Sequence, residues 1–412
     1  MASFYIPLTG LNSDATALNT IANNLSNMNT TGYKDQTVNF SDFFYQQIGQ
    51  TGSGNPIQQG SGVQTADIAS NFTQGNVNAT GTASNMAIDG NGFFVLSAGN
   101  GANLYTRNGN FTMTASGGLV SQDGHAVMGY PATNGVVNTN APLTALNIPV
   151  GQVEPPAATT SMSMTANLSS AAAVGTSVPS QITLYDSLGQ SHVATINYTK
   201  TGTNTWSYSI SLPPGDQTAS GTSTNTTGTL TFNSSGNLVT PASNVTGISF
   251  TGLADGASNL TFGWNLYNTA GNSTLTQVDA ASAVSATNQN GYASGEYQSF
   301  AVNSDGTVVA TFSNGEQQAV GQVALATVVN PQGLRMLGNG EYATTLASGS
   351  AVSGVSGTAG LGTIQGGSLE QSNVNISTEF SNLIIAQRAF EANSKAVTTF
   401  DTVAQDTIDM VR

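Results

Sequence analysis

The sequence ISTEFSNLIIAQRAFEANSKAVTTFDTVAQDTIDMVR, residues 376–412, determines how we interpret both ends of the chain. Read in heptads from Leu383, it repeats apolar residues every three or four positions, as a helix does along the line where it packs on another helix. No Pro or Gly interrupts the stretch, and Asn375 or Ser377 can cap its first turn. We therefore predict one long amphipathic helix here.

The first thirty residues predict a second amphipathic helix. Its apolar residues step by three and four positions, Pro7 is tolerated in the first turn, and Gly32 is a plausible stop. Two packings are open: a helical hairpin within one chain, or packing against other copies in an open, head-to-tail assembly. The candidate packing residues are Leu11, Leu18, Ala22, Leu25, Leu383, Phe390, Val397, Phe400, Ala404 and Val411.

Composition separates these ends from the middle of the chain. Charged residues make up 7% of the 412 residues, and Gly, Ser, Thr, Asn and Ala dominate, which favours β-rich domains of extracellular type. A formal net charge of −14 argues against binding to nucleic acid or to anionic membrane surfaces. Cysteine is absent, so disulfides and thiolate metal sites are excluded. We find neither a Sec-type signal nor an apolar run that could span a membrane, and we expect secretion without a cleaved signal.

The middle of the chain alternates large apolar with small polar residues in short runs separated by Asn-Gly and Asp-Gly turns, as antiparallel strands do. Clear examples are residues 182–185, 193–198 and 206–210. We predict a multidomain α+β chain whose terminal helices form a coiled-coil-like pair, with two nested all-β domains between them. The predicted parts are a terminal helical domain (1–31 plus 370–412), a connector (32–75 plus 358–369), an inner β domain (76–145 plus 285–357) and an inserted outer β domain (146–284). Loose joins at 49–62, 141–156 and 282–295 are candidate hinges.

The sequence carries few residues or motifs that indicate catalysis or ligand binding. Of the two histidines, His125 and His192, each is expected to be a surface or turn residue. Nucleophile elbows, phosphate loops, zinc-protease motifs and EF-hand spacings are absent from the sequence, and the acidic residues are scattered singly. We predict no catalytic residue, cofactor or metal, and hence no enzyme.

Three motifs carry a family resemblance. Residues 21–34, IANNLSNMNTTGYK, resemble the N-terminal signature of bacterial flagellar rod and hook proteins. Residues 87–95 with 105–111 resemble the first β motif of that family, and residues 369–374 with 379–393 resemble its C-terminal helix signature. The motif residues that we carry over are Asn23, Asn24, Asn27, Gly32, Tyr33, Lys34, Gln387 and Arg388.

The middle of the chain favours the hook branch of this family over the rod branch. Residues 184–189, LYDSLG, and residues 312–315 and 330–334 resemble hook sequences, and a rod protein would have a shorter insert. The resemblance implies a subunit of a curved, flexible extracellular tube, the flagellar hook, that works as a universal joint transmitting motor torque. It also implies inner helices that pack between subunits, passage through the flagellar export apparatus, and contacts with distal rod, hook cap and hook–filament junction proteins.

Two alternatives stay open at this point: a distal rod protein of the basal body, and a secreted β-domain protein that binds glycans as an adhesin. The adhesin alternative requires an exposed aromatic platform, for which Trp206, Trp264, Tyr185 and Tyr208 are the candidates. Their alternation with polar residues favours burial instead.

Overall fold

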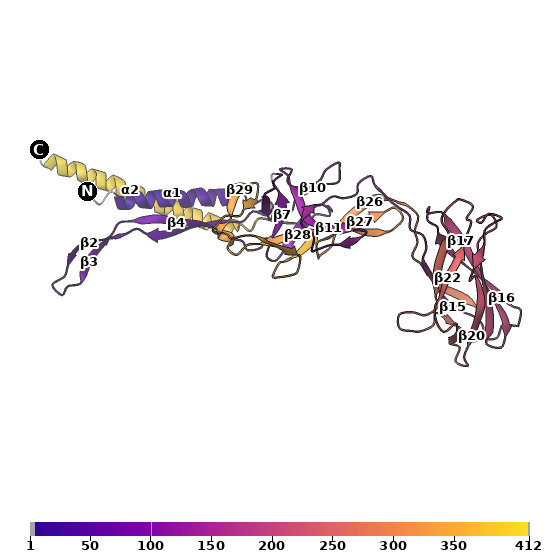
Figure 1. Ribbon diagram of the computed structural model, residues 1–412. Helices are drawn as coiled ribbons and strands as arrows, with labels where there is room; N and C mark the ends of the chain where they lie inside the picture. Colours follow the sequence, from indigo (N-terminus) through magenta and orange to yellow (C-terminus); the bar gives the residue numbers. More distant parts are fainter. Residues whose placement is uncertain (1–4, 100, 411–412) are drawn as a thin grey trace. The chain divides into compact units, whose positions relative to one another are not determined.

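The computed structural model of the chain describes residues 5–99 and 101–410 (Figure 1). Its long helices are α1 (Tyr5–Ser26) and α2 (Ile376–Met410), so both predicted terminal helices are confirmed. The side-chain oxygen of Asn375 accepts hydrogen bonds from the backbone N–H groups of Ser377 and Thr378, at 3.0 and 3.2 Å, which caps α2. Val411, the last predicted packing residue, lies outside the described residues. The described chain is mostly β-structure between two terminal helices.

The chain divides into two compact units. Their boundaries fall after residue 150 and within strands β26 (Gly295–Val302), β27 (Thr307–Phe312) and β28 (Gln317–Thr327). Unit 1 contains residues 1–150, 300–310 and 318–412, and unit 2 contains residues 151–299 and 311–317. The strands of unit 1 are β1 (Gln36–Asp42), β2 (Tyr45–Gln50), β3 (Pro56–Gly60), β4 (Val63–Ser70), β5 (Val77–Ala79), β6 (Met86–Asp89), β7 (Phe93–Ser97), β8 (Asn103–Thr106), β9 (Thr112–Met113), β10 (Leu119–Val120), β11 (Ala126–Thr133), β12 (Val136–Val137), β13 (Thr144–Ala145), most of β28 (Gln317–Thr327), β29 (Arg335–Gly338), β30 (Glu341–Ala343), β31 (Val352–Val355), β32 (Thr363–Gly366) and β33 (Ser368–Glu370). A short 3-10 turn, η1 (Pro331–Gly333), precedes β29.

The main sheet of unit 1 has the neighbour order β28-β11-β7-β8-β30-β29, and the pairs that adjoin β7 and β11 are antiparallel. Its core contains a group of aromatic rings in edge or tilted contact: Phe72, Phe93 and Tyr342 have centroid separations of 5.6 to 5.7 Å. Two small ribbons, β6 with β32 and β5 with β33, join the first β motif to the segment that leads into α2.

A long antiparallel arm follows α1. Strand β1 pairs with β4, and beyond them β2 pairs with β3. The prediction that residues 49–62 are a loose connector is therefore wrong for residues 49–50 and 56–60, which lie in β2 and β3. The ribbon was missed because β2 and β3 are rich in glutamine and mostly exposed, so they lack the alternation of a half-buried strand.

Unit 2 is a sandwich of two sheets. Its strands are β14 (Val153–Glu154), β15 (Ser161–Asn167), β16 (Ser177–Tyr185), β17 (Ser191–Gly202), β18 (Thr205–Ser211), β19 (Ser223–Thr224), β20 (Thr227–Phe232), β21 (Leu238–Thr240), β22 (Val245–Phe250), β23 (Leu260–Asn265), β24 (Leu275–Thr276) and β25 (Ala283–Gln289), with parts of β26 (Gly295–Val302) and β27 (Thr307–Phe312). One sheet has the order β16-β17-β18-β20-β21 and the other β19-β22-β23-β15-β24, with β25 beside β15. Because β25 pairs with β15, residues 283–289 of the predicted hinge at 282–295 are a strand.

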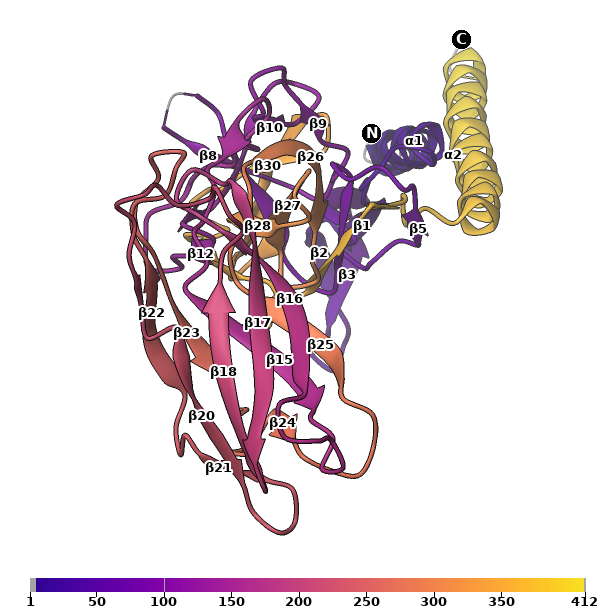
Figure 2. The ribbon, with the colours of Figure 1, turned by 90° about the vertical axis from the view of Figure 1, so that its right-hand side faces the viewer.

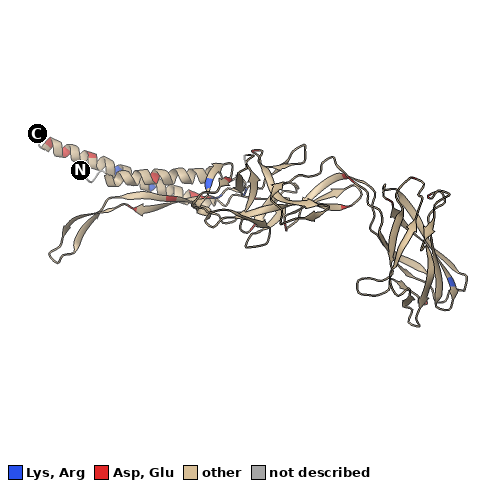
Figure 3. Ribbon diagram, viewed as in Figure 1, with Lys and Arg blue, Asp and Glu red and all other residues tan. Residues whose placement is uncertain are grey.

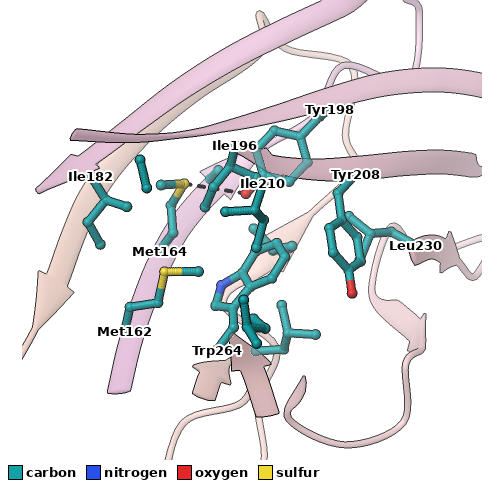
Figure 4. Close-up of a cluster of buried hydrophobic side chains, with 14 of the residues drawn as sticks. Met162, Met164, Ile182, Ile196, Tyr198, Tyr208, Ile210, Leu230 and Trp264 are labelled. Carbon is teal, nitrogen blue, oxygen red and sulfur yellow. Dashed lines mark hydrogen bonds between the residues drawn. The ribbon is translucent and has the colours of Figure 1, made fainter. Parts of the chain in front are cut away.

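The two sheets of unit 2 enclose one large apolar core (Figure 4). Trp206 and Trp264 are both 0% exposed, and the Tyr208 ring meets the Trp264 ring edge-on at 5.1 Å. Tyr208 is also buried and Tyr185 is half-buried. None of the four aromatic residues named for a glycan platform is exposed, which removes the sequence basis of the adhesin alternative.

Candidate assembly interface

Helices α1 and α2 are neighbours (Figure 2), and they run antiparallel (Figure 1). Near the start of α1, Gly10 faces Asn393, so closely that a Cβ atom on Gly10 would lie 2.6 Å from the Asn393 side-chain nitrogen. That nitrogen donates a hydrogen bond to Asp14 at 2.8 Å. At the other end of the pair, Asn24 donates to Glu379 at 3.4 Å. Small and polar side chains therefore form the contact between the helices.

The leucines of α1 lie beside this contact and not at its centre. The buried residues of α1 are Pro7, Gly10, Ser13, Thr20 and Asn24. The predicted packing residues Leu11, Leu18 and Leu25 are half-buried, and Ala22 is exposed. The pairing of the two helices thus leaves part of the apolar stripe of α1 accessible.

On α2, some of the predicted packing residues are half-buried and others are exposed. Leu383, Val397 and Ala404 are half-buried, whereas Phe390 and Phe400 are each 37% exposed. Val403 and Met410, on the flank of the predicted packing line, also point into solvent. So do apolar side chains that the heptad frame did not single out; they are Ile376, Phe380, Ile384, Ile385 and Ile408. Their signal was present in the sequence as a second apolar stripe, and the contact line drawn from Leu383 excluded it.

The last three turns of α2 extend past the described part of α1 (Figure 1). With Gly10 opposite Asn393 in an antiparallel pair, Tyr5 falls near residue 398. Almost every residue from 398 to 410 is exposed, including Val403, Ile408 and Met410. This segment is helical and carries an apolar side that the described residues of the chain do not cover.

Two grooves border the helical pair. One, of about 400 Å³, lies between α1, α2 and β1, and Ala17, Ile21, Val38, Phe40 and Ile385 line it together with polar residues. The other, of about 240 Å³, lies where the start of α1 meets the arm, between Ile6 and Phe44. The arm itself exposes Phe43, Phe44, Tyr45, Ile48 and Ile57. The arm and α2 therefore add to one apolar surface around the helices.

The motif residues gather at the other end of α1, in a polar junction. Asn24 accepts hydrogen bonds from the Tyr33 hydroxyl at 3.0 Å and the Gln36 backbone N–H at 2.9 Å, and it donates to the Gln36 carbonyl at 2.8 Å. Asn23 donates to the Tyr33 hydroxyl at 3.1 Å, and Asn27 donates to the Asn23 carbonyl at 2.9 Å. The asparagine-rich helix end thus holds the turn that redirects the chain from α1 into β1.

Gly32 is required at this turn for two reasons. Its φ is +68°, in the left-handed region, and a Cβ atom there would lie 2.7 Å from the Arg107 backbone. Its N–H donates to the Glu370 carbonyl at 2.8 Å. The N-terminal motif, the first β motif and the C-terminal motif therefore meet at this glycine.

A buried ion cluster lies directly behind the turn. Lys34 donates to Glu370 at 2.7 Å and to the Thr73 carbonyl at 2.7 Å, and Arg107 reaches the second oxygen of Glu370 at 3.3 Å. Both Lys34 and Glu370 have wholly buried side chains. Burial lowers the pKa of Lys34, and the Glu370 carboxylate opposes that shift. One carboxylate thus joins two cations from distant segments, which is stable only while all three remain paired.

Two further carboxyl groups lie in the junction. Burial raises the pKa of Glu379, in the first turn of α2, and the hydrogen bond from Asn24 works against that rise. Burial also raises the pKa of Asp35, against hydrogen bonds from Asn71 and Asn373. Burial, with the charges of Asp35 and Glu379, raises the pKa of Tyr33 to about 12. Tyr33 and Lys34 were named from the sequence, but Arg107, Glu370 and Glu379 were not recognised as their partners. The one available signal was that Arg107 is among only seven Lys and Arg residues in the chain.

The motif residues Gln387 and Arg388 do not join the junction. Both are exposed on α2, and Arg388 pairs with Glu391 at 3.2 Å on the helix surface. Charged side chains are sparse elsewhere on the ribbon (Figure 3). Within residues 5–99 and 101–410, no helix combines the length and the apolarity needed to cross a membrane.

Of the two histidines, His125 lies at the end of a turn as expected, and His192 does not. His192 is buried on β17 and contacts Asp186 and Asp216, so its assignment as a surface or turn residue is wrong. His125 is half-buried and contacts Glu341 at 2.9 Å. The Glu341 partner of His125 is distant in sequence and only the fold reveals it. The partners of His192 are Asp186, across a tight turn, and Asp216, from a later loop.

Comparison with known families matches four parts of the chain. Residues 4–34 match the family described as flagella basal body rod protein, and residues 87–167 match the flagellar hook protein FlgE/F/G D1 domain. Residues 158–292 match the flagellar basal body protein FlaE D2 domain, and residues 365–410 match the flagellar basal body rod FlgEFG protein C-terminal family.

Full-length relatives and one solved structure agree with these matches. The chain is 34% identical to the flagellar hook protein FlgE of Escherichia coli over 99% of this chain and 100% of that one. It is 32% identical to the flagellar hook protein FlgE of Treponema pallidum over the whole of both chains. The crystal structure of Helicobacter pylori flagellar hook protein FlgE2 shares the fold, with a TM-score of 0.53 and 15% identity over 70% of this chain and 99% of that one.

Proposed function

Because the chain belongs to the flagellar hook protein FlgE family and is a structural subunit of the hook, we propose that α1 and α2 supply the contacts through which its copies polymerise. The resemblance to hook proteins seen in the motifs is confirmed. In this proposal Leu11, Leu18, Ala22, Leu25, Leu383, Phe390, Val397, Phe400, Ala404 and Val411 pack between subunits. Ile384 and Ile385 join them, because they are among the more exposed apolar residues of the same helix.

One observation carries the proposal: helix α2 displays a long apolar side that the described residues 5–99 and 101–410 leave exposed. Val403, Ile408 and Met410 are 55%, 65% and 80% exposed. Burying apolar surface contributes about 25 cal/mol per Å², so a contiguous uncovered stripe favours association. A neighbouring subunit that presents its own α1, or the exposed aromatic residues of its arm, would cover that stripe.

We further propose that the predicted domains have separate roles in a flexible tube. A terminal helical domain (1–31 plus 370–412) would form the inner wall of a tube, and a connector (32–75 plus 358–369) would lead to an inner β domain (76–145 plus 285–357) and an inserted outer β domain (146–284). The buried cluster of Lys34, Arg107 and Glu370 supports this division, because it fixes the bases of both helices to the β layer of unit 1. Bending at residues 141–156 would let the tube curve while it transmits torque.

The same proposal extends to partners and location. The subunit would meet distal rod, hook cap and hook–filament junction proteins at the ends of the tube, and the flagellar export apparatus on its way out of the cell without a cleaved signal peptide. It would neither catalyse a reaction nor insert into a membrane. The net charge of −14 supports the further expectation that it binds no nucleic acid.

Electron microscopy of purified protein after salt-induced polymerisation tests the proposal. The full chain should form tubes, and a chain lacking residues 1–30 and 370–412 should form none. In Ile385→Asp a charge enters the proposed interface at a side chain that is 67% exposed in the single chain, so tubes should be lost while the subunit stays folded.

Val174→Asp provides a matched control. Val174 is 68% exposed in a turn of unit 2, so the substitution has the same chemistry and the same exposure away from the helices. It should polymerise as the wild type does. Normal tubes from Ile385→Asp, or equal loss from both variants, would contradict the assignment of the interface to α2.

A further inference from the structure

His192 is held by carboxylates on both sides of its ring, inside unit 2. Its Nδ1 lies 2.8 Å from Asp216, its Nε2 lies 3.0 Å from Asp186, and Asp255 lies 4.0 Å from the same Nε2. The His192 side chain is 4% exposed and that of Asp186 is 0% exposed. We refer to Asp186, His192, Asp216 and Asp255 as the histidine cluster.

The histidine cluster joins loops that belong to both sheets of the sandwich. Asp186 lies in the turn between β16 and β17, and Asp216 lies in the loop after β18, so both come from the five-stranded sheet. Asp255 lies in the loop between β22 and β23 of the other sheet. Hydrogen bonds from Ala254 N–H to the Asp216 carbonyl, at 2.9 Å, and from Ser258 N–H to the Ser187 hydroxyl, at 3.0 Å, connect the same loops.

Asp186 has two tasks in this arrangement. One of its oxygens accepts the backbone N–H groups of Leu188 and Gln190, at 2.8 and 3.0 Å, which shapes the predicted tight turn at 186–189. Its other oxygen faces His192. The imidazole is therefore bonded to a carboxylate whose position the turn has already fixed.

The arrangement favours a ring in which both nitrogens carry protons. A neutral imidazole has one N–H and one lone pair, so a neutral His192 would direct a lone pair at a carboxylate about 3 Å away. The charged groups that face the ring from the packed elements are Asp186, Asp216 and Asp255, all of them acidic. Burial alone would lower the pKa of His192, but the hydrogen bonds and charges of Asp186 and Asp216 outweigh burial and raise it.

We propose that His192 is a proton-dependent clasp, which holds the loops at 212–222 and 251–259 together for as long as its imidazole carries both protons. When a proton leaves, one of the two short hydrogen bonds is lost and a lone pair faces a carboxylate. The loops then loosen, while the apolar core between the sheets stays packed. Nothing in this proposal depends on polymerisation, so it is tested on the unassembled full chain.

The pH direction follows from linkage. For a histidine whose folded pKa is raised, the stabilising contribution is complete below the unfolded value of about 6.5 and is lost as pH rises through the folded pKa. The loops at 212–222 and 251–259 should therefore be well protected from hydrogen exchange at pH 6. They should lose protection at pH values above the titration of His192.

Nuclear magnetic resonance of full-length protein with ¹³C-labelled histidine rings measures the titration directly. The chain has two histidines, so a His125→Gln variant assigns the remaining signal to His192. The His192 signal should titrate at higher pH than a free imidazole, whose pKa is about 6.5. Titration at or below pH 6.5 would overturn the proposal, because the ring would then be neutral in the folded chain at neutral pH. EDTA in every sample keeps a bound metal ion from imitating the shift.

Hydrogen exchange with mass spectrometry measures the clasp itself. After correction for intrinsic rates, loops 212–222 and 251–259 of the wild type should exchange about tenfold faster above the His192 midpoint than below it. His192→Gln, which cannot place a charged donor on each side, should exchange fast at both pH values. Asp216→Asn, a change at the partly exposed rim of the cluster, provides a second variant should His192→Gln fail to fold; it should lower the midpoint and loosen the loops. Equal loop exchange on both sides of the midpoint in the wild type would overturn the proposal.

Discussion

Trp206 and Trp264 lie wholly inside the core of unit 2, whereas Ile384, Ile385 and Met410 of unit 1 point from α2 into solvent. In unit 2 the Trp264 ring meets the rings of Tyr198 and Tyr208 between two sheets. In the helical pair the contact is made by Gly10, Asn24 and other small or polar residues. The sandwich buries its large apolar side chains, and the helices leave several of theirs exposed.

The buried charged groups of the two regions also connect different parts of the chain. In unit 1, Lys34, Arg107 and Glu370 come from three motifs and join the bases of the helices to the β layer. In unit 2 the histidine cluster joins loops of the sandwich to one another. The first set of ions therefore positions the two helices and their exposed apolar side chains, and the second connects loops within the sandwich.

Two spectroscopic signals separate the regions. Both tryptophans lie in unit 2, so tryptophan fluorescence follows that unit. The long helices of the described chain are α1 and α2, both in unit 1, so circular dichroism at 222 nm is dominated by them. The predictions below use these signals to test whether the two regions are stabilised independently.

The largest effect is expected from Phe250→Ala in unit 2. Phe250 is fully buried and stacks on Phe262 with ring centroids 6.3 Å apart, so truncation leaves a cavity that costs about 4 kcal/mol. Chemical denaturation followed by tryptophan fluorescence should shift to lower denaturant, and the helix signal should shift little. Val174→Ala, at an exposed site of the same unit, should stay within about 0.5 kcal/mol of the wild type. A matching loss in the helix signal would show that the regions unfold together.

A smaller but still large effect is expected from Glu370→Gln in unit 1. The substitution keeps the shape of the side chain and leaves Lys34 and Arg107 buried without a negative partner, at a cost of about 3 kcal/mol. The loss should appear in the helix signal and leave tryptophan fluorescence unchanged. Arg388→Ala breaks an exposed ion pair on α2 and should cost no more than about 0.5 kcal/mol. Equal losses from both variants would refute the role given to the buried cluster.

The elements that periodicity predicted were those with one clear apolar face. Residues 182–185, 193–198 and 206–210 were recognised as strands because each alternates, and all three line the core of unit 2. The terminal helices were recognised by their three- and four-residue steps. The ribbon of β2 and β3 was not, because its residues are exposed on both faces and no alternation marks it.

The site was only half predictable for a related reason. The motifs named Asn24, Gly32, Tyr33 and Lys34, which lie close together in sequence. Their partners Arg107, Glu370 and Glu379 are distant in sequence, and no spacing rule connects a lysine to a carboxylate 336 residues away. The heptad rule likewise placed Leu383 on a contact line, but it could not tell which apolar stripe the chain itself would cover.

The smallest effect, and the sharpest probe of the polar helix contact, is expected from Glu379→Gln. Because the folded pKa of Glu379 is raised above 4.5 by burial, the folded chain holds this proton more tightly than the unfolded chain does. The free energy of unfolding should therefore fall as pH rises from the ordinary pKa of Glu379 through its raised pKa in the folded chain. It should stay lower at all pH values above that range. Glu379→Gln removes the penalty and keeps a side-chain amide that can bond Asn24.

Thermal melts at 222 nm should show this as a gain of about 2 °C for Glu379→Gln at pH 7, shrinking to nothing in acid. The gain is small because the variant also gives up a negative charge in the first turn of α2, where the helix dipole favours one. Glu391→Gln, an exposed change on the same helix, should show no such pH-dependent gain. If Glu379→Gln instead melts lower at pH 7, the charged carboxylate stabilises the helix pair, and the contact between α1 and α2 depends on its ions as firmly as the cluster around Glu370 does.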